Sequence, residues 1–308
     1  MNTPNIAMPG PSFSSQASAP RTISSFQSFY WSVRREFWEN RLIYIAPLAA
    51  AVVFLIAFLI NMISLRYRMH GSSSAINLVN LQKPFDLPHE LSAALIMGIA
   101  LVVGIFYSLD ALYGERRDRS ILFWKSMPVS DLTTVLSKFA IPLVIIPVLS
   151  YAIAVVTQFI MLLLASTVLA GSGANIAALW TEQTLFRSSL DLFYHMLTVH
   201  GLWYAPLYAW LLLVSAAAPR APFVWAVLPP FVIWGVEKIA FNTTYFLSFL
   251  KGRLMGPPDP QMTMPSGDFM STLIPHRFFD QPGLWAGLAV AAVFLAITVR
   301  LRRYRGPI

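Results

Sequence analysis

The sequence predicts an all-α membrane protein with six transmembrane helices and an amphipathic interfacial helix in front of them. Of the 308 residues, 56% are hydrophobic and 12% are charged, and the mean hydropathy is +0.61. Soluble domains carry about 25% charged residues, so half that density indicates a membrane protein. Because a helix needs roughly 20 apolar residues to cross the hydrocarbon, six apolar runs qualify as spans. They are 42–65, 91–113, 139–169, 193–218, 223–241 and 283–301.

The N-terminal region divides into a tail and a helix. Residues 1–20 are rich in Pro, Ser, Ala and Asn and have neither a basic start nor an apolar core, so we expect a disordered tail and not a signal peptide. Residues 21–308 form the single transmembrane domain. It begins with the interfacial helix, 22–41, which is expected to lie flat in the headgroup layer. The alternative is a plain cytosolic extension of the first span.

The interfacial helix is predicted from an apolar stripe at helical spacing. Phe26, Tyr30, Val33 and Phe37 form this stripe. The residues largely opposite are Ser25, Ser28, Ser32, Arg35, Glu36 and Glu39. An aromatic-rich face beside a polar one is typical of a helix at a membrane surface.

The basic residues indicate the topology. With both termini inside, fourteen of the 22 Lys and Arg residues fall on the cytoplasmic side, as the positive-inside rule expects. Arg66 and Arg68, just past the first span, count against this assignment. We therefore interpret the net charge of +8 as a topology signal of a multi-pass inner-membrane protein and not as a nucleic-acid interface.

Prolines and small residues mark particular positions in the spans. Pro142 and Pro147 in the third span break backbone hydrogen bonding there, and Pro229–Pro230 do so in the fifth. The third span is longer than the hydrocarbon requires, so we expect it to tilt or to project beyond the bilayer. Gly287 and Ala291 in the sixth span have the four-residue spacing that permits close helix contact.

Three ionisable residues lie within or at the ends of spans. Asp110 is near the cytoplasmic end of the second span, and Glu237 and Lys238 are near the external end of the fifth. Ionisable residues at such positions are candidates for a functional role, so these three are candidate intramembrane polar residues. For Asp110 and Lys238, the alternative is that they lie close enough to the interfaces to snorkel or to form pairs.

The external loop 242–282 is uneven. Its start, "NTTYFLSFLKGRLM", has a one-sided apolar stripe at helical spacing, and such a half-helix can dip back into the bilayer edge. Its middle is too rich in Pro and Gly for a helix. It also contains Met255, Met262, Met264 and Met270, and the spacing of Met262 and Met264 would suit Cu(I). Methionine is equally an adaptable filler of apolar surfaces.

The sequence contains no motif for catalysis or nucleotide binding. There is no G-x-x-x-x-G-K-[ST] and no G-x-S-x-G, and the chain has no Cys. His195 and His200 lie five residues apart, whereas a helical zinc pair needs a spacing of four with a neighbouring Glu. We therefore expect neither an enzyme nor a cofactor or metal on this chain.

The only long charged stretch in the middle of the chain is residues 114–138, which we call the island. It continues the second span as a charged, partly amphipathic helix, and Pro128 ends that helix. Ser130 then has the position of an N-cap before a new helix, and Asp131 favours the same helix start. The sequence thus predicts a helix–turn–helix below the membrane, a shape suited to docking.

The island segment "ERRDRSILFWKSMPVSDLTTVLSK" resembles the cytoplasmic signature of ABC-2-type transporter permeases. That pattern has an acidic–Arg pair, a Gly-Thr-Leu-like step, an apolar run, then Pro-Val-Ser and a Lys at the mouth of the next span. The matching residues are Glu115, Arg116, Ser120, Ile121, Pro128, Val129, Ser130 and Lys138. Arg119 stands where the pattern usually has Gly, and Leu122 where it often has an acid. The layout of the whole chain is similar too.

The resemblance implies the fold and the partners of a bacterial ABC-2 exporter. The permease would dimerise with a second copy or a homologous permease, and each half would dock a separate ATPase subunit that holds ATP and Mg. The implied ATPase-coupling residues are Glu115, Arg116, Arg119, Pro128, Val129, Ser130 and Asp131. The implied substrate is hydrophobic or amphipathic. The alternative function is a non-conducting membrane scaffold or sensor subunit that docks an ATPase.

Overall fold

The computed structural model describes residues 24–71, 78–127, 129–170, 180, 185–255 and 278–308. These residues form helices joined by turns, with no strand among them, so the predicted all-α class is confirmed. Five helices are long and apolar enough to cross a membrane, or six if a bent pair counts as one span. The predicted tail, 1–20, lies outside the described residues.

The helices follow the predicted spans closely. Their bounds are α1 (Ser25–Glu39), α2 (Leu42–Gly71), α3 (Leu78–Asp110), α4 (Tyr113–Arg117), α5 (Ile121–Ser126), α6 (Asp131–Ala140), η1 (Ile141–Ile145), α7 (Ile146–Leu169), α9 (Leu185–His195), η2 (Met196–Trp203), α10 (Ala205–Ala217), α11 (Pro222–Phe241), α12 (Tyr245–Met255), η4 (Phe278–Asp280) and α13 (Pro282–Tyr304). The bent pair is the fourth predicted span, in which segments 192–203 and 205–217 meet at 44°.

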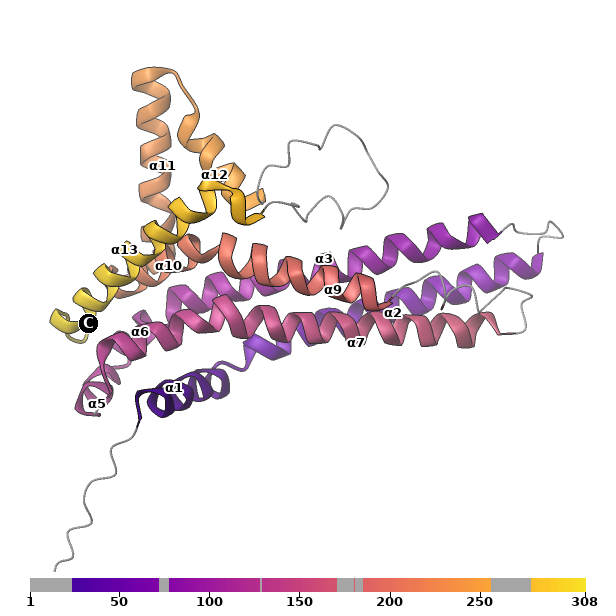
Figure 1. Cartoon of the computed structure of the whole chain (residues 1–308), viewed down its shortest axis with the longest axis horizontal. Helices are drawn as coiled ribbons and strands as arrows, with labels where there is room; N and C mark the ends of the chain where they lie inside the picture. The colour runs from indigo at the N-terminus through magenta and orange to yellow at the C-terminus, as the bar shows by residue number, and fades with distance from the viewer. Residues whose placement is uncertain (1–23, 72–77, 128, 171–179, 181–184, 256–277) are drawn as a thin grey trace, which may run out of the picture.

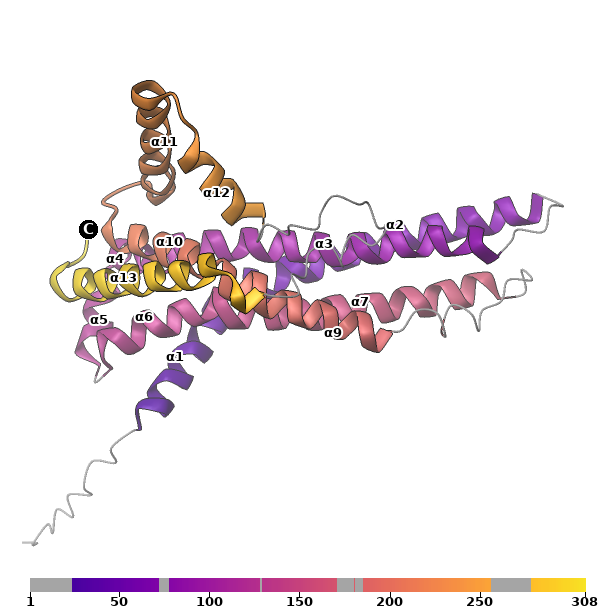
Figure 2. The ribbon, with the colours of Figure 1, turned by 45° about the horizontal axis from the view of Figure 1, so that its top comes forward.

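Three long helices, α2, α3 and α7, pack side by side along the long axis of the molecule (Figure 1). Against one end of this bundle pack α10 and α13, which contact each other and bury a core that includes Tyr208, Leu212 and Leu284. The island helices α4 to α6, helix α1 and the C-terminus all lie at this same end (Figures 1 and 2). Segments from the start, the middle and the end of the chain are thus brought together there.

The prolines of the third span change the backbone hydrogen-bonding pattern but do not end the helix. The stretch Ile141–Ile145, which contains Pro142, is a π-helix, and the run from Asp131 to Leu169 stays continuous over 39 residues. A second π-helix, η2, lies against it. A Cβ on Gly201 would lie 3.1 Å from the carbonyl oxygen of Leu143, so glycine allows this close approach. Short π-helical segments within α-helices occur frequently at functional sites.

Helix α11 has the length and apolarity of a span but runs away from the bundle, and α12 returns toward it (Figures 1 and 2). Only Ala226 of α11 is buried. The helix begins after Ala221 and ends before Asn242, and both of these residues have positive φ angles, of 45° and 49°. Sharp turns at both ends thus set the direction of α11, a feature that hydropathy does not predict.

Candidate functional site

Six charged side chains meet where the island joins the rest of the molecule, and we call them the charged cluster. They are Arg35, Glu36, Glu115, Asp131, Lys138 and Arg302. Three are acids and three are bases, so the cluster is electrically balanced. They come from α1, α4, α6 and α13, and the ion pairs therefore tie the N-terminal helix, the island and the last helix together.

Lys138 and Glu36 are the most deeply buried pair of the cluster. Lys138 Nζ lies 2.7 Å from Glu36 Oε1, with residue exposures of 2% and 1%. The hydroxyl of Tyr107 donates to Glu36 Oε2 at 2.9 Å, and Arg35 Nη2 lies 2.5 Å from Glu36 Oε1. Buried charges are retained in proteins when they are paired and hydrogen-bonded in this way.

The pairing keeps Glu36 ionised. Burial alone would raise the pKa of this carboxyl, but the ammonium of Lys138 and the guanidinium of Arg35 outweigh burial, and the pKa lies below its ordinary 4.5. A depressed pKa in the folded state means that the stabilisation from Glu36 is present at neutral pH and is lost as the pH falls through the folded-state value.

Glu115 connects the same cluster to the last helix. Its Oε1 lies 3.1 Å from Lys138 Nζ, and its Oε2 accepts a hydrogen bond from Arg302 Nη1 at 3.0 Å. Arg302 Nε also donates to Asp131 Oδ1 at 3.1 Å. The structure thus pairs Glu115 and Asp131, two of the predicted ATPase-coupling residues, within the chain. Glu115 is buried and Asp131 is half-buried.

The side chain of Arg116 likewise makes its hydrogen bonds within the chain. It is buried, and its Nη1 donates to the carbonyls of Ala216 at 2.8 Å and Ala218 at 3.1 Å, at the turn between α10 and α11. Its own carbonyl accepts a hydrogen bond from Ile308 N at 3.2 Å. The guanidinium of Arg116 thus joins the start of the island to the turn after α10, and its assignment as an ATPase-coupling residue stays a prediction.

The exposed part of the island lies between Glu115 and Lys138, the first and last residues that match the family pattern. Arg119 is exposed and has a φ of 58°, a left-handed conformation that favours glycine. Among its described residues, the island's exposed large apolar side chains are Leu122, Phe123, Met127, Leu132 and Leu136. Val129 is half-buried, and its N–H donates to the carbonyl of Met127 at 2.7 Å. Pro128 lies outside the described residues.

Helix α5 is fixed to α1 by a stacked cation. The guanidinium carbon of Arg35 lies 3.7 Å from the ring centroid of Trp124. Such a cation–π contact stabilises a partly buried pair by about 1–2 kcal/mol. Since Arg35 also reaches Glu36 and Glu115, one side chain links α1, α4 and α5. The polar face of α1, expected to face solvent, instead holds the island at Arg35 and Glu36.

The predicted N-cap of α6 is confirmed. Ser130 has extended backbone angles, and its hydroxyl accepts a hydrogen bond from Thr133 N at 3.1 Å. We predict that Ser130→Ala lowers the free energy of unfolding by about 1 kcal/mol, because the first turn of α6 loses an acceptor. Thermal unfolding of the detergent-solubilised protein measures this. Ser126→Ala, in an exposed position of the island, is the control and should change little; equal shifts for both variants would contradict the capping role.

The three candidate intramembrane polar residues have local partners. Asp110 is exposed at the end of α3, and its Oδ1 lies 3.9 Å from Arg117 Nη1. Glu237 accepts hydrogen bonds from the backbone N–H groups of Tyr245 and Phe246 at 2.6 and 2.9 Å, so it caps the start of α12. Lys238 Nζ donates to Asn242 Oδ1 at 3.0 Å. Asp110 and Lys238 thus each have a partner near a helix end, as the alternative for these two residues expects.

The sequence reasoning missed the central role of three residues. Glu36 was assigned to the polar face of the interfacial helix, Lys138 to the end of the family pattern, and Arg302 to the topology signal. The spacing of 102 residues between Glu36 and Lys138 leaves no local pattern to find. Met262, Met264 and Met270 of the Met-rich loop lie outside the described residues, and the described part of the chain holds no His, Cys, Asp and Glu group suited to a metal ion.

Comparison of the chain with known protein families, with curated proteins and with solved structures finds no match. The geometry of the charged cluster and of the island therefore provides the structural basis for a functional conclusion.

Proposed function

We propose that this chain is the membrane-spanning subunit of an ATP-driven exporter of the ABC-2 type. It would work as a dimer with two separate ATPase subunits. The proposal joins the resemblance of the island segment to a multi-pass helical chain whose sequence has no nucleotide-binding motif of its own.

The observation that carries the proposal is the exposed apolar surface of the island. Leu122 and Phe123 are each 58% exposed, at the end of the bundle where charged side chains gather. Exposed apolar side chains that lie beside charged ones are typical of a protein–protein contact, and aromatic residues are enriched in such contacts. A separate ATPase subunit is the partner that the resemblance implies for this surface.

The charged cluster supports a mechanical role for the same element. A partner that moves the island also moves α6, and α6 continues without a break into the third span. Through Glu36 and Arg302 the same displacement reaches α1 and α13. A docked ATPase would therefore act on several membrane helices at once, as an alternating transport cycle requires.

Two local features agree with the family pattern. Arg119 adopts a left-handed conformation at the position where the pattern usually has Gly. Glu115 and Lys138, which match the first and last charged positions of the pattern, lie 3.1 Å apart. The first and last charged residues of the matching segment thus lie in contact, which supports treating the island as one structural element.

Assembly tests the proposal directly. The chain is co-expressed with a candidate P-loop ATPase subunit from the same genome and purified through a tag on the ATPase, and native mass measurement is expected to show two copies of each chain. ATP-dependent flux in vesicles then separates an exporter from a non-conducting scaffold. A chain that stays monomeric and binds no ATPase would contradict the proposal.

The proposed orientation places the island in the cytoplasm. Because the chain has no cysteine, a single Cys can be introduced at Tyr67 or at Ser126, both exposed and at opposite ends of the bundle. We expect Tyr67→Cys to react with an impermeant maleimide in intact cells and Ser126→Cys to react only after permeabilisation. The opposite result would invert the topology, which Arg66 and Arg68 make worth checking.

A further inference from the structure

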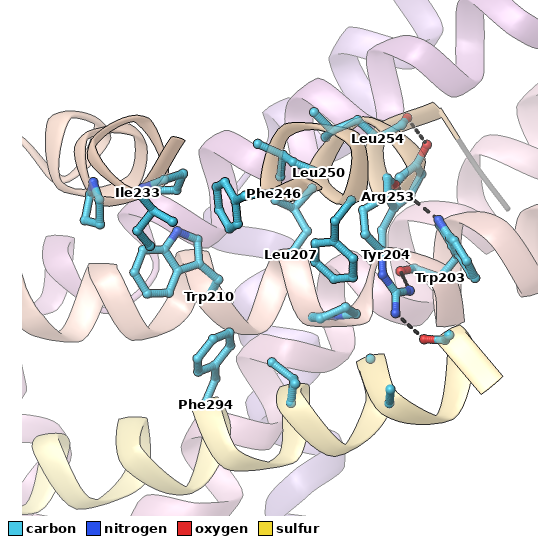
Figure 3. Close-up of a pocket in the computed structure, with 18 residues that line it drawn as sticks. Trp203, Tyr204, Leu207, Trp210, Ile233, Phe246, Leu250, Arg253, Leu254 and Phe294 are labelled. Atoms are coloured by element: carbon cyan, nitrogen blue, oxygen red, sulfur yellow. Dashed lines mark hydrogen bonds between the residues drawn. The ribbon is translucent and has the colours of Figure 1, made fainter. Parts of the chain in front are cut away.

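A cavity of about 340 Å³ lies between the α11–α12 arm and the bundle (Figure 3). Small-molecule sites in proteins begin at roughly this size, about 300 Å³. Its walls come from η2, α10, α11, α12 and α13, and the labelled side chains that point into it are almost all apolar. Aromatic residues include Trp203, Tyr204, Trp210, Phe246, Phe249 and Phe294.

The N–H and O–H donors of three aromatic residues in this wall already make hydrogen bonds within the chain. The indole N–H of Trp203 donates to the carbonyl of Arg253 at 3.2 Å, and the hydroxyl of Tyr204 donates to the carbonyl of Leu254 at 2.9 Å. The indole N–H of Trp210 donates to the carbonyl of Ala226 at 3.2 Å. These bonds fix the α11–α12 arm to the bundle, and they leave none of the three donors for a ligand.

Among the described residues that line this cavity, Arg253 is the one that carries a charge. Its guanidinium carbon lies 4.2 Å from the ring centroid of Trp203, and the group donates to the carbonyls of Trp203 and Gly283. In the described part of the chain, no carboxylate lies within ion-pair distance of it. A guanidinium has five N–H donors, so two carbonyl contacts leave donors available. Burial lowers the pKa of Arg253, as expected for a cation without a counter-ion.

The position of the guanidinium depends on Gly287 of α13. A Cβ at this residue would overlap Arg253 Nη2, so a larger residue here would displace the guanidinium from its present position. Gly287 was predicted to allow close helix contact. In the structure it also leaves the space that the guanidinium of Arg253 occupies at the edge of the apolar cavity.

We propose that this cavity binds an anionic amphiphile, with its carboxylate or phosphate head on Arg253 and its aliphatic tail among the aromatic side chains, and that such amphiphiles are the substrate class of the exporter. The planar guanidinium suits both head groups because it donates two parallel hydrogen bonds. The binding site stands on the geometry alone, whereas its assignment to the transported substrate rests on the proposed function.

Binding is measured on the purified chain without any ATPase, in nanodiscs of zwitterionic lipid. Dansyl-labelled undecanoic acid serves as the probe, and energy transfer from tryptophan reports its binding, with empty nanodiscs as the blank. Dodecanoate and dodecyl phosphate are expected to displace the probe about tenfold or more better than dodecanol, because only the acids gain charge-assisted hydrogen bonds. The stronger of the two acids identifies the head group.

Variants locate the site. Arg253→Gln is expected to weaken dodecanoate binding about tenfold or more and to leave dodecanol unchanged, while Lys251→Gln, an exposed cation on the same helix, changes neither. Ala286→Trp keeps the charge but fills the cavity, so it should weaken all three ligands. Equal displacement by alcohol and acids, or undiminished binding to Arg253→Gln, would overturn the proposed site.

The outcome is separable from the proposed function. If dodecanoate binds through Arg253 but does not change the ATPase rate of the assembled complex, the site is real and the assignment to the substrate is wrong. If the assembly with an ATPase fails, the binding result on the chain alone is unaffected.

Discussion

Replacing Lys138 by Met is expected to lower the free energy of unfolding by about 3–5 kcal/mol, because Glu36 and Glu115 then stay buried without the cation they share. For a protein of this size such a change corresponds to a melting temperature lower by on the order of 10 °C. The measurement is the temperature at which the detergent-solubilised protein loses its monodisperse peak in size-exclusion chromatography.

Two further variants make this result specific to the charged cluster. Lys125→Met removes a cation of the same island that is exposed and donates only to the carbonyls of Arg303 and Arg305, so its effect should be small. Lys138→Met combined with Glu36→Gln restores the charge balance and should cost less than the sum of the single changes. Identical melting of the Lys138 and Lys125 variants would show that the cluster does not hold the island.

Replacing Leu122 and Phe123 together by Ser is expected to abolish coupling while leaving stability almost unchanged. Both side chains are exposed, and surface changes of this kind usually alter stability by no more than about 0.5 kcal/mol. Truncating central contact residues of an interface costs about 2 kcal/mol or more, which weakens ATPase binding roughly 30-fold. Co-purification of the ATPase and its stimulated ATP hydrolysis are the measurements.

The matched control is Tyr304→Ser, which removes a large exposed apolar side chain at the same end of the molecule but outside the island. It should retain both ATPase binding and stimulation. Normal co-purification of the Leu122 and Phe123 double variant would leave the island without a docking role. Charge reversal at Glu115 cannot answer this question, because Glu115 is buried and its reversal would disrupt Arg302 and Lys138 within the chain.

The features that depend on local pattern were predictable from the sequence. Long apolar runs, the cap at Ser130 and the apolar stripe of 245–250 each require only a few neighbouring residues, and the structure has helices at all of them. The third span, expected to exceed the hydrocarbon, forms a continuous helical run of 39 residues. Hydropathy and capping are short-range signals, so one chain suffices to find them.

The features that depend on tertiary pairing were not predictable. Arg302 and Glu115 are 187 residues apart, and either one alone looks like an ordinary charge near a membrane surface. The direction of α11 depends on positive φ angles at Ala221 and Asn242, two residues that take this conformation less readily than glycine. Arg253 was counted as one more basic residue of an external loop, because nothing local indicates the glycine of α13 that makes room for it.

The order in which a ribosome makes the chain determines when the charged cluster can close. Glu36 meets its cation once the chain has grown 102 residues further, but Arg302 follows Glu115 by 187 residues. During synthesis the island therefore exists for a long interval with Glu115 and Asp131 lacking one of their cations. Helix α13 supplies this cation, Arg302, so Glu115 and Asp131 lack the side chain that joins them until α13 has been made. The ion pairs of the charged cluster are therefore complete only after α13 has been synthesised and packed against the island.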